Sequence, residues 1–158
     1  MSEPIPVLPH KHLTTLRLQV DTAHSAQIGA TPNGHRTIAP IKAGTFSGDR
    51  LNGNVLNGGA DWVRTRPDGA LIIDVRLTLK TDDEALIYLS YEGRFIGGVE
   101  AMQALARGQT LDPDAYSLLT VAKFECGADR YSWLNDVIAV GVGTQSGFNP
   151  VYTIYQIG

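Results

Sequence analysis

Two acidic residues and an arginine lie close to a pair of glycines in this chain of 158 residues. The stretch LNGGADW leads two glycines into Asp61 and Trp62, and Asp74-x-Arg76 follows between apolar neighbours. Because side chains two residues apart on a strand share a face, Asp74 and Arg76 can form a charge-assisted pair. The pattern is typical either of a solvated surface ion pair or of a clamp for a carbonyl or an anion.

The clamp interpretation predicts a candidate catalytic set made of Asp61, Asp74, Arg76 and Tyr88. One of the carboxylates would move a proton, Arg76 would hold a carbonyl or carboxylate, and Tyr88 would share the developing charge. The candidate ligand-binding residues are Trp62, Arg64, Tyr91, Trp133 and Asn135. The competing interpretation is that the polar residues cover a solvated sheet face and that the aromatic residues only pack.

The sequence indicates neither a metal site nor a cofactor site. His10-x-His12 places two imidazoles on one strand face, but no nearby acid completes a set of metal ligands. The glycines at 53, 58 and 59 are followed by neither Lys-Ser nor Lys-Thr, and by no helix, which excludes a phosphate loop. Cys126 is the only cysteine, and nothing in KFECGADR implies the lowered pKa of a nucleophile.

The elements that must position these residues are short. Alternating apolar runs separated by Gly, Pro, Asn and Asp predict strands within residues 14–21, 36–46, 60–66, 70–80, 84–93, 116–125, 136–144 and 151–158. Residues 99–107 combine good helix formers with Gly108 as a stop. About eight strands, one short helix and connections too short for crossover helices predict an all-β fold, an antiparallel sandwich or closed barrel.

Two predicted hairpins assign the side chains to faces. RPDG, residues 66–69, suits a type I turn that pairs Arg64 with Ile72. A three-residue loop at 81–83 would pair Arg76 with Tyr88. One face of the three strands is then the core, with Val63, Ile73, Val75, Leu77, Leu79, Ile87, Leu89 and Tyr91, and Asp61 falls among them. The other face carries Trp62, Arg64, Asp74, Arg76, Thr78, Tyr88 and Ser90 and is either a solvated exterior or the wall of a polar pocket.

Length and composition limit the partners. We expect residues 1–158 to form one domain, with residues 1–11 as an extended arm. A formal charge of −3 without a basic run argues against binding to nucleic acid. No apolar stretch approaches the roughly 20 residues of a membrane helix, no signal core is present, and the single cysteine favours the cytoplasm. Apolar residues on both faces of 151–157 indicate an oligomer, most simply a homodimer.

The combination of these motifs resembles a known family. The run from LNGGADW to SYEG, residues 56–93, together with RYSWLNDVIAVGVG and the terminal VYTIYQI, is similar to domain of unknown function 3237, also called uncharacterised protein family 0311. The resemblance extends from about residue 12 to residue 157 and implies a small antiparallel β-barrel of the calycin or allene-oxide-cyclase type. It implies no reaction. The family commonly has Asp-Gly where this chain has Asp83-Glu84, which changes the turn chemistry there.

Two functional hypotheses follow. The first is a cofactor-independent isomerase, cyclase, lyase or hydratase that acts on a small, partly apolar carbonyl or carboxylate compound held in the barrel. The second is a non-catalytic carrier or sensor that uses the same pocket, and an inert structural subunit is a weaker third. The pocket decides between them, because a catalyst needs a titratable group with a shifted pKa and a carrier needs only an apolar cavity.

Overall fold

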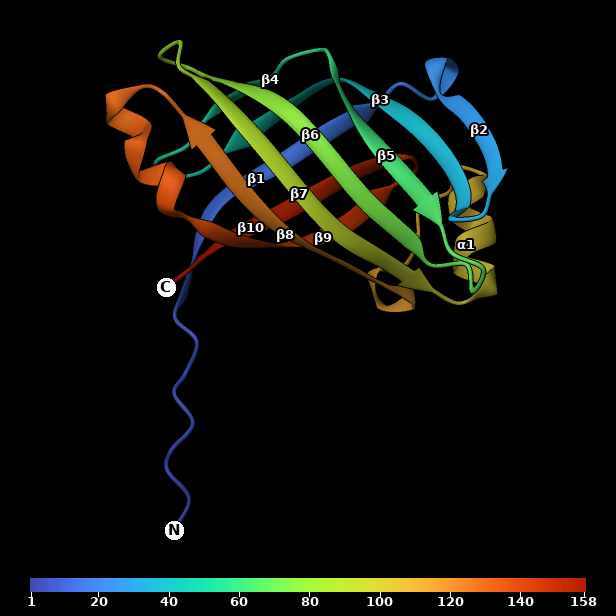
Figure 1. Cartoon of the computed structure of the whole chain (residues 1–158), viewed down its shortest axis with the longest axis horizontal. Helices are drawn as coiled ribbons and strands as arrows, with labels where there is room; N and C mark the ends of the chain where they lie inside the picture. Colours follow the sequence, from blue (N-terminus) through green and yellow to red (C-terminus); the bar gives the residue numbers. More distant parts are fainter.

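Along the strands, inward-facing apolar side chains alternate with outward-facing side chains, and this alternation determines the fold. In the computed structural model, which describes residues 1–158, β6 reads buried and exposed in turn from Ile73 to Thr81, and β7 and β8 do the same. A sheet with one apolar face buries it by curling onto itself, because closure removes the unpaired edges. The chain forms one sheet of ten strands, all antiparallel, and the pairing of β1 with β3 closes it into a barrel (Figure 1).

The strands follow the chain around the barrel almost in order. Their bounds are β1 His10–Val20, β2 Ala26–Thr31, β3 Gly34–Ser47, β4 Gly53–Val55, β5 Gly59–Thr65, β6 Leu71–Thr81, β7 Leu86–Gly97, β8 Tyr116–Cys126, β9 Ile138–Ser146 and β10 Asn149–Ile157. The short strands β4 and β5 both bridge β3 and β6, so that eight strand positions surround the core. β2 is a flap on the edge of β3.

The two ends of the barrel are covered differently. The helix α1 (Val99–Ala106) and the 3₁₀ helices η1 (Thr22–His24) and η2 (Pro113–Ala115) lie toward one end, whereas η3 (Asp129–Asp136) lies at the opposite end (Figure 1). The side chain of Leu134 in η3 is fully buried and Trp133 packs against the core. Trp133 and Leu134 therefore pack onto this end of the barrel, which is the role that the competing interpretation gives to the aromatic residues. Residues 1–9 precede β1, are exposed, and extend away from the barrel (Figure 1).

No helix in the structure is both long enough and apolar enough to span a membrane.

The predicted all-β barrel is confirmed, as are the eight predicted strands and the helix over 99–107. Two strands were missed. β2 is exposed or half-exposed along its length, so its sequence AQIGAT carries no apolar alternation. β4 has only three residues between turns. Both lack the burial that creates a readable pattern.

The first predicted hairpin register is correct and the second is wrong. Arg66 N–H donates to Ala70 O (2.8 Å), and Arg64 lies opposite Ile72. In the second hairpin Thr81 N–H donates to Ala85 O (2.9 Å), so the three-residue loop lies at 82–84, one residue later than predicted, and Arg76 lies opposite Ser90 instead of Tyr88. This loop contains Glu84 at a left-handed φ of 75°, the conformation that a glycine would adopt more easily.

The register error leaves the face assignment unchanged, because a shift of two residues preserves the side-chain alternation. The predicted core face lies inside the barrel, where Ile73, Val75, Leu77, Leu79, Ile87, Leu89 and Tyr91 are buried and Val63 packs against them. The face that carries Asp74 and Arg76 lies outside. The question of which face lines the interior is thereby settled.

The two glycines before Asp61 have different roles. Gly58 has φ 118° and open space around it, so it is needed for the turn into β5. Gly59 begins β5 directly against β6. A Cβ added at Gly59 would lie 2.5 Å from Arg76 O and 2.7 Å from Leu77 Cδ2. The second glycine therefore allows β5 to approach β6.

We expect Gly59→Ala to destabilise the protein by about 1–3 kcal/mol, because the added methyl group must push β5 away from the β6 backbone. Urea denaturation would measure the loss. Gly127→Ala is the matched control, since no atom lies within 4 Å of a Cβ at that position. Equal stability of the two variants would contradict the proposed close approach.

Candidate functional site

The barrel contains a cavity of about 660 Å³ that is partly open at the end near α1. Fourteen of its 23 lining residues are hydrophobic, and Met102, Leu105 and Phe148 lie at this end. Asp61 is the only charged residue that lines it. The other polar groups are neutral: Tyr91, Tyr152, Gln145, Gln27, Thr22, Ser25, Thr37 and Thr65. This composition is typical of a pocket for one small, largely apolar molecule.

The register places the acid and a tyrosine in one row across the sheet. Asp61 on β5 lies opposite Val75 on β6, and Val75 lies opposite Tyr91 on β7. The Tyr91 ring contacts the ring of Tyr152 from β10 edge-on, with centroids 5.1 Å apart. Three strands thus bring one carboxyl group and two phenols to the same interior.

An interruption in the β5–β6 ladder holds the Asp61 side chain. Paired residues run from Asp61 opposite Val75 directly to Arg64 opposite Ile72, and the two intervening pairs, Trp62 with Asp74 and Val63 with Ile73, are absent. The Asp74 N–H, left without its strand partner, donates to Asp61 Oδ1 at 3.0 Å. The Trp62 carbonyl accepts instead from Arg36 Nη1 at 2.5 Å. One carboxylate oxygen of Asp61 is therefore fixed by the backbone, while the other makes no hydrogen bond within the protein.

Burial raises the pKa of Asp61 to about 7, because the apolar cavity disfavours the charged carboxylate. The negative charge of Asp74 raises this pKa further. The hydrogen bond from Asp74 N–H and the positive charge of Arg36 act in the opposite direction. An acid that titrates near neutral pH can both accept and donate a proton, which is the requirement for general acid–base catalysis.

The two tyrosines are held in their neutral form. Burial is the largest cause that raises the pKa of each, and the negative charge of Asp61 adds to it. Their hydroxyl groups therefore remain hydrogen-bond donors at any physiological pH. A neutral donor next to a carboxyl group near its midpoint is a combination that can stabilise an oxyanion as a proton is removed.

Small residues on β9 make room for this group. Ala139, Gly141 and Gly143 face inward, and a Cβ at Gly143 would lie 2.5 Å from Leu118 and 2.9 Å from Tyr152 Cε1. At Gly143 the side chains of Tyr152 and Leu118 occupy the space that a Cβ would need.

The predicted catalytic set is divided between two sides of the sheet. Asp61 and the predicted ligand residue Tyr91 line the cavity. Asp74, Arg76 and Tyr88 lie on the barrel exterior, and Asp74 and Arg76 form a half-exposed ion pair at 3.8 Å. Asp61 therefore shares no pocket with these three residues, because odd and even residues of β5, β6 and β7 point in opposite directions.

Four other predicted ligand residues also lie away from the cavity. Trp62 is stacked outside the barrel under the guanidinium of Arg76, 4.0 Å from the ring centroid. Arg64 is outside as well and donates to Asn33 O (3.0 Å). Trp133 packs at the η3 end, with the Arg50 guanidinium 4.1 Å from its ring centroid. Asn135 ties β8 to η3 by accepting from Cys126 N–H (2.9 Å).

Sequence reasoning missed Tyr152 and Gln145. The signal for Tyr152 was present, because in VYTIYQI it shares parity with Ile154, which is buried beside the core. Gln145 had no such signal. Its side-chain Oε1 is shielded from solvent without a hydrogen-bond partner, an arrangement visible only in three dimensions.

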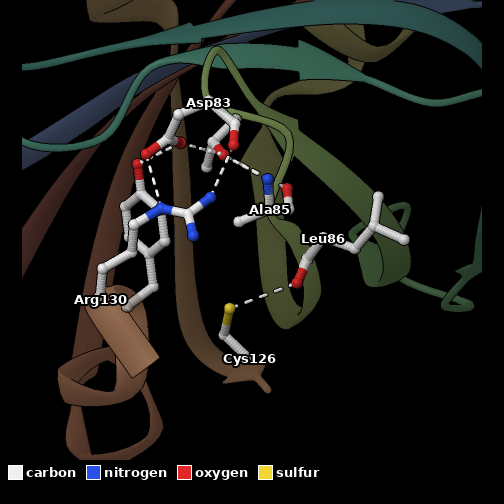
Figure 2. A network of polar contacts seen from close by, with 7 residues as sticks. Asp83, Ala85, Leu86, Cys126 and Arg130 are labelled. Atoms are coloured by element: carbon white, nitrogen blue, oxygen red, sulfur yellow. Dashed lines mark hydrogen bonds and ion pairs between the residues drawn. The ribbon is translucent and has the colours of Figure 1, made fainter. Parts of the chain in front are cut away.

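A second polar cluster lies at the η3 end, and Figure 2 shows it. Asp83 accepts hydrogen bonds from Arg130 Nε (2.6 Å), Tyr131 OH (2.8 Å) and Thr81 Oγ1 (2.6 Å). Arg130 Nη2 also donates to the Asp83 carbonyl. These bonds lower the pKa of Asp83, led by the one from Thr81. The cluster fastens η3 to the β6–β7 turn, and Cys126 Sγ nearby contacts Leu86 O at 3.3 Å (Figure 2).

Comparison with known proteins identifies the family. Residues 9–157 match the family described as "Protein of unknown function (DUF3237)". The chain belongs to this family. The DUF3237 chain is 31% identical to a UPF0311 protein of Rhodopseudomonas palustris over 96% of its own length and 98% of that protein. It is also 34% identical to a UPF0311 protein of Clostridium acetobutylicum over 78% of each.

Solved structures show the same barrel. A β-barrel-like protein of Acinetobacter baumannii is 36% identical with a TM-score of 0.84, covering 99% of this DUF3237 chain and 100% of that one. A conserved protein of unknown function from R. palustris is 29% identical with a TM-score of 0.91, covering 98% and 100%. An enzyme from Penicillium herquei is 19% identical with a TM-score of 0.72, covering 100% and 99%, and at that identity it shows the fold alone.

The raised pKa of Asp61 predicts a pH-dependent stability difference between the DUF3237 protein and Asp61→Asn. In the unfolded chain this carboxyl ionises near its ordinary pKa, so the favourable contribution of its protonated form is complete below pH ~4 and lost as pH rises to about 7. We take the free energy of unfolding of Asp61→Asn minus that of the parent protein. We expect this difference to be about 2–4 kcal/mol more favourable to the variant at pH 8 than at pH 4. Denaturant titrations at both pH values measure this, and a pH-independent difference would contradict it.

Asp83 predicts the opposite trend. Because its pKa is lowered on folding, its stabilising contribution is present above the unfolded pKa near 4 and is lost as pH falls. We expect Asp83→Asn to lower the melting temperature at pH 7 and to lower it less at pH 3. Asp82→Asn is the control, since the exposed neighbour has no side-chain hydrogen bond. Equal effects of the two substitutions at pH 7 would show that the cluster does not fasten η3.

Proposed function

We propose that this protein is a cofactor-independent enzyme that uses Asp61 as a general acid–base on a small, uncharged, largely apolar carbonyl compound. The observation that supports this most is the position of Asp61. It is a carboxyl group with a pKa of about 7, fixed through one oxygen, in an apolar cavity beside two neutral tyrosines. A group with a pKa matched to the working pH is the mark of a proton-transfer residue.

The chemistry proposed is the removal and return of a proton next to a carbonyl group. The free oxygen of the Asp61 carboxylate accepts a proton from the carbon, and the electron pair moves onto the carbonyl oxygen. Tyr91 or Tyr152 donates a hydrogen bond to that oxygen and stabilises its charge. Asp61 then returns the proton to another carbon of the conjugated system, which gives an isomer. Alternatively, the carbonyl re-forms as the bond to a leaving group on the β-carbon breaks, and Asp61 gives its proton to that group, which is the reaction of a lyase. The reverse of this elimination, with water as the added molecule, is the reaction of a hydratase.

The lining narrows the substrate class. The sequence-based expectation included carboxylate compounds held by Arg76, but Arg76 lies outside the barrel. No Lys, Arg or His lines the cavity, and its one ionisable acid becomes negative as it loses its proton. An anionic substrate would therefore be repelled without a counter-charge. A neutral ketone or enone fits the lining better.

The fold neighbour from P. herquei supports catalysis only weakly. That protein is described as an enzyme, and its likeness extends over the whole barrel. Because unrelated functions share barrel folds, the likeness permits a catalytic role and says nothing of the reaction.

A second candidate is a carrier or sensor for the same class of molecule. The apolar majority of the lining favours it, since tight binding needs only shape and burial. Under this alternative Asp61 would act as one hydrogen-bonding group among several, and its replacement would change affinity without abolishing a reaction.

Deuterium exchange separates the two functions. We expect the protein to accelerate exchange of the protons next to the carbonyl of 2-tetralone and of cyclohexenone in D₂O, followed by ¹H NMR. Asp61→Asn should reduce the acceleration by about 10²–10⁴-fold while retaining ligand-induced chemical-shift changes. Asp74→Asn, which removes the exterior carboxylate beside the same gap, is the matched control. It should retain most of the exchange, because loss of that charge lowers the pKa of Asp61 but leaves the interior base in place.

The other outcomes are equally informative. Binding of the probes without accelerated exchange, and with an affinity that Asp61→Asn changes, would support the carrier. Equal loss of exchange in Asp61→Asn and Asp74→Asn would overturn the assignment of the interior carboxyl as the base. Tyr91→Phe and Tyr152→Phe test the donors, and at least one should slow exchange by about 10-fold or more.

A further inference from the structure

The outer surface of β7, β8 and β9 carries a patch that does not belong to the cavity. Three of its apolar side chains are strongly exposed: Leu119 (50%), Val121 (53%) and Val142 (45%). Val140 lies among them and is half-buried. Contiguous exposed apolar side chains on a sheet face mark an interaction site more often than a solvated surface.

The register arranges this patch in two parallel rows. One row runs from Glu92 on β7 through Val121 on β8 to Val140 on β9. The other runs from Arg94 through Leu119 to Val142 on the same three strands. We call the first the acidic row and the second the basic row. Each row has one charged end and two apolar members.

The charged ends form no ion pair within the chain, and the one side-chain hydrogen bond of Arg94 goes to the neighbouring Gly93 carbonyl. Both Glu92 and Arg94 are exposed on one face of β7. Glu92 also lies directly opposite Asp74, and two acids in that position repel each other. A cation approaching from outside would relieve this repulsion.

We propose that the two rows form a two-fold interface with a second copy of this chain. The two-fold axis lies in the plane of the interface, midway between the two rows and perpendicular to the strands. Rotation about this axis places the acidic row of each copy against the basic row of the other. Glu92 of each copy then faces Arg94 of the other, Val121 faces Leu119, and Val140 faces Val142. A surface that is complementary to itself under rotation is what an isologous dimer requires.

The shape of the barrel limits the contact to these strands. The exterior is convex, so a flat facing surface reaches only a few neighbouring strands before they curve away. Ile96 and Ile138, exposed by 50% and 58%, lie beyond the basic and acidic rows respectively and extend the patch along the strands. The sequence analysis expected a homodimer through residues 151–157, whereas the interface proposed here lies on β7, β8 and β9. The side chain of Ile154 on β10 points into the core. Only the outward residues of β10, such as Tyr155 opposite Val140, adjoin the patch.

Charge reversal tests the pairing. We expect the wild-type protein to dimerise in sedimentation equilibrium as its concentration rises from about 1 µM to about 500 µM. Glu92→Arg places two arginines against each other in both charged contacts at the β7 edge of the interface, and Arg94→Glu does the same with two glutamates. Each should weaken dimerisation by about tenfold or more. The double exchange Glu92→Arg with Arg94→Glu restores the pairing and should restore the dimer.

Glu125→Arg is the matched control, since it reverses an exposed acid on β8 outside both rows and should leave the association constant unchanged. Circular dichroism confirms that each variant is folded. A wild-type protein that remains monomeric throughout the range overturns the proposal. Single reversals that dimerise normally overturn it as well, as does a double exchange that stays monomeric. The result is independent of the function of the cavity, because none of these residues lines it.

Discussion

Closure of one antiparallel sheet is the constraint on which the rest of this structure depends. When β1 pairs with β3, every residue of the barrel strands must point either inward or outward, and neighbouring residues take opposite directions. The inner face becomes a single core, and the outer face becomes the whole lateral surface. Asp61 and Trp62, adjacent in the chain, are thereby assigned to different environments and to different chemistry.

An inward acid is costly in such a barrel unless the backbone supports it. The missing Trp62–Asp74 pair provides that support, because the free Asp74 N–H binds one oxygen of Asp61 and Arg36 takes the carbonyl that the ladder leaves unpaired. The hydrogen bond from Asp74 N–H and the positive charge of Arg36 lower the pKa of Asp61 by less than burial raises it. Its pKa consequently remains near 7 instead of returning to that of an exposed aspartate. A local defect in the sheet thus positions the only charged group of the cavity.

Alternation in the sequence was sufficient to predict an antiparallel sandwich or barrel and the composition of the core face, and the resemblance to the family narrowed the fold to a barrel. The helix over 99–107 followed from its helix-forming residues. Alternation also placed Asp61 among core residues. Three details were beyond it. The position of the β6–β7 loop, one residue later than predicted, depends on the hydrogen bonds of Thr81 and Asp83 in the turn and on the positive φ of Glu84, which the residue type does not predict. The approach of Tyr152 to Tyr91 depends on how far β10 lies from β7 around the closed ring. The choice of Asp74, Arg76 and Tyr88 as site residues followed from chemical type alone, since no pattern in one sequence says whether a polar face points into a cavity.

Asp74 and Arg76 belong to a polar surface on the outside of the barrel. This surface also carries Trp62, Arg36 and Glu92. Asp74 affects the cavity in two ways. Its backbone N–H donates a hydrogen bond to Asp61, and its negative charge acts across the sheet to raise the pKa of Asp61. An additional cation near Glu92 would partly screen the acidic pair outside, and the field at Asp61 would change with it, although the two carboxylates are on opposite faces. If the two rows pair between copies, dimerisation outside the barrel is coupled electrostatically to proton transfer inside it. The coupling runs through Asp74, which lies opposite Glu92 outside and whose charge acts on Asp61 inside.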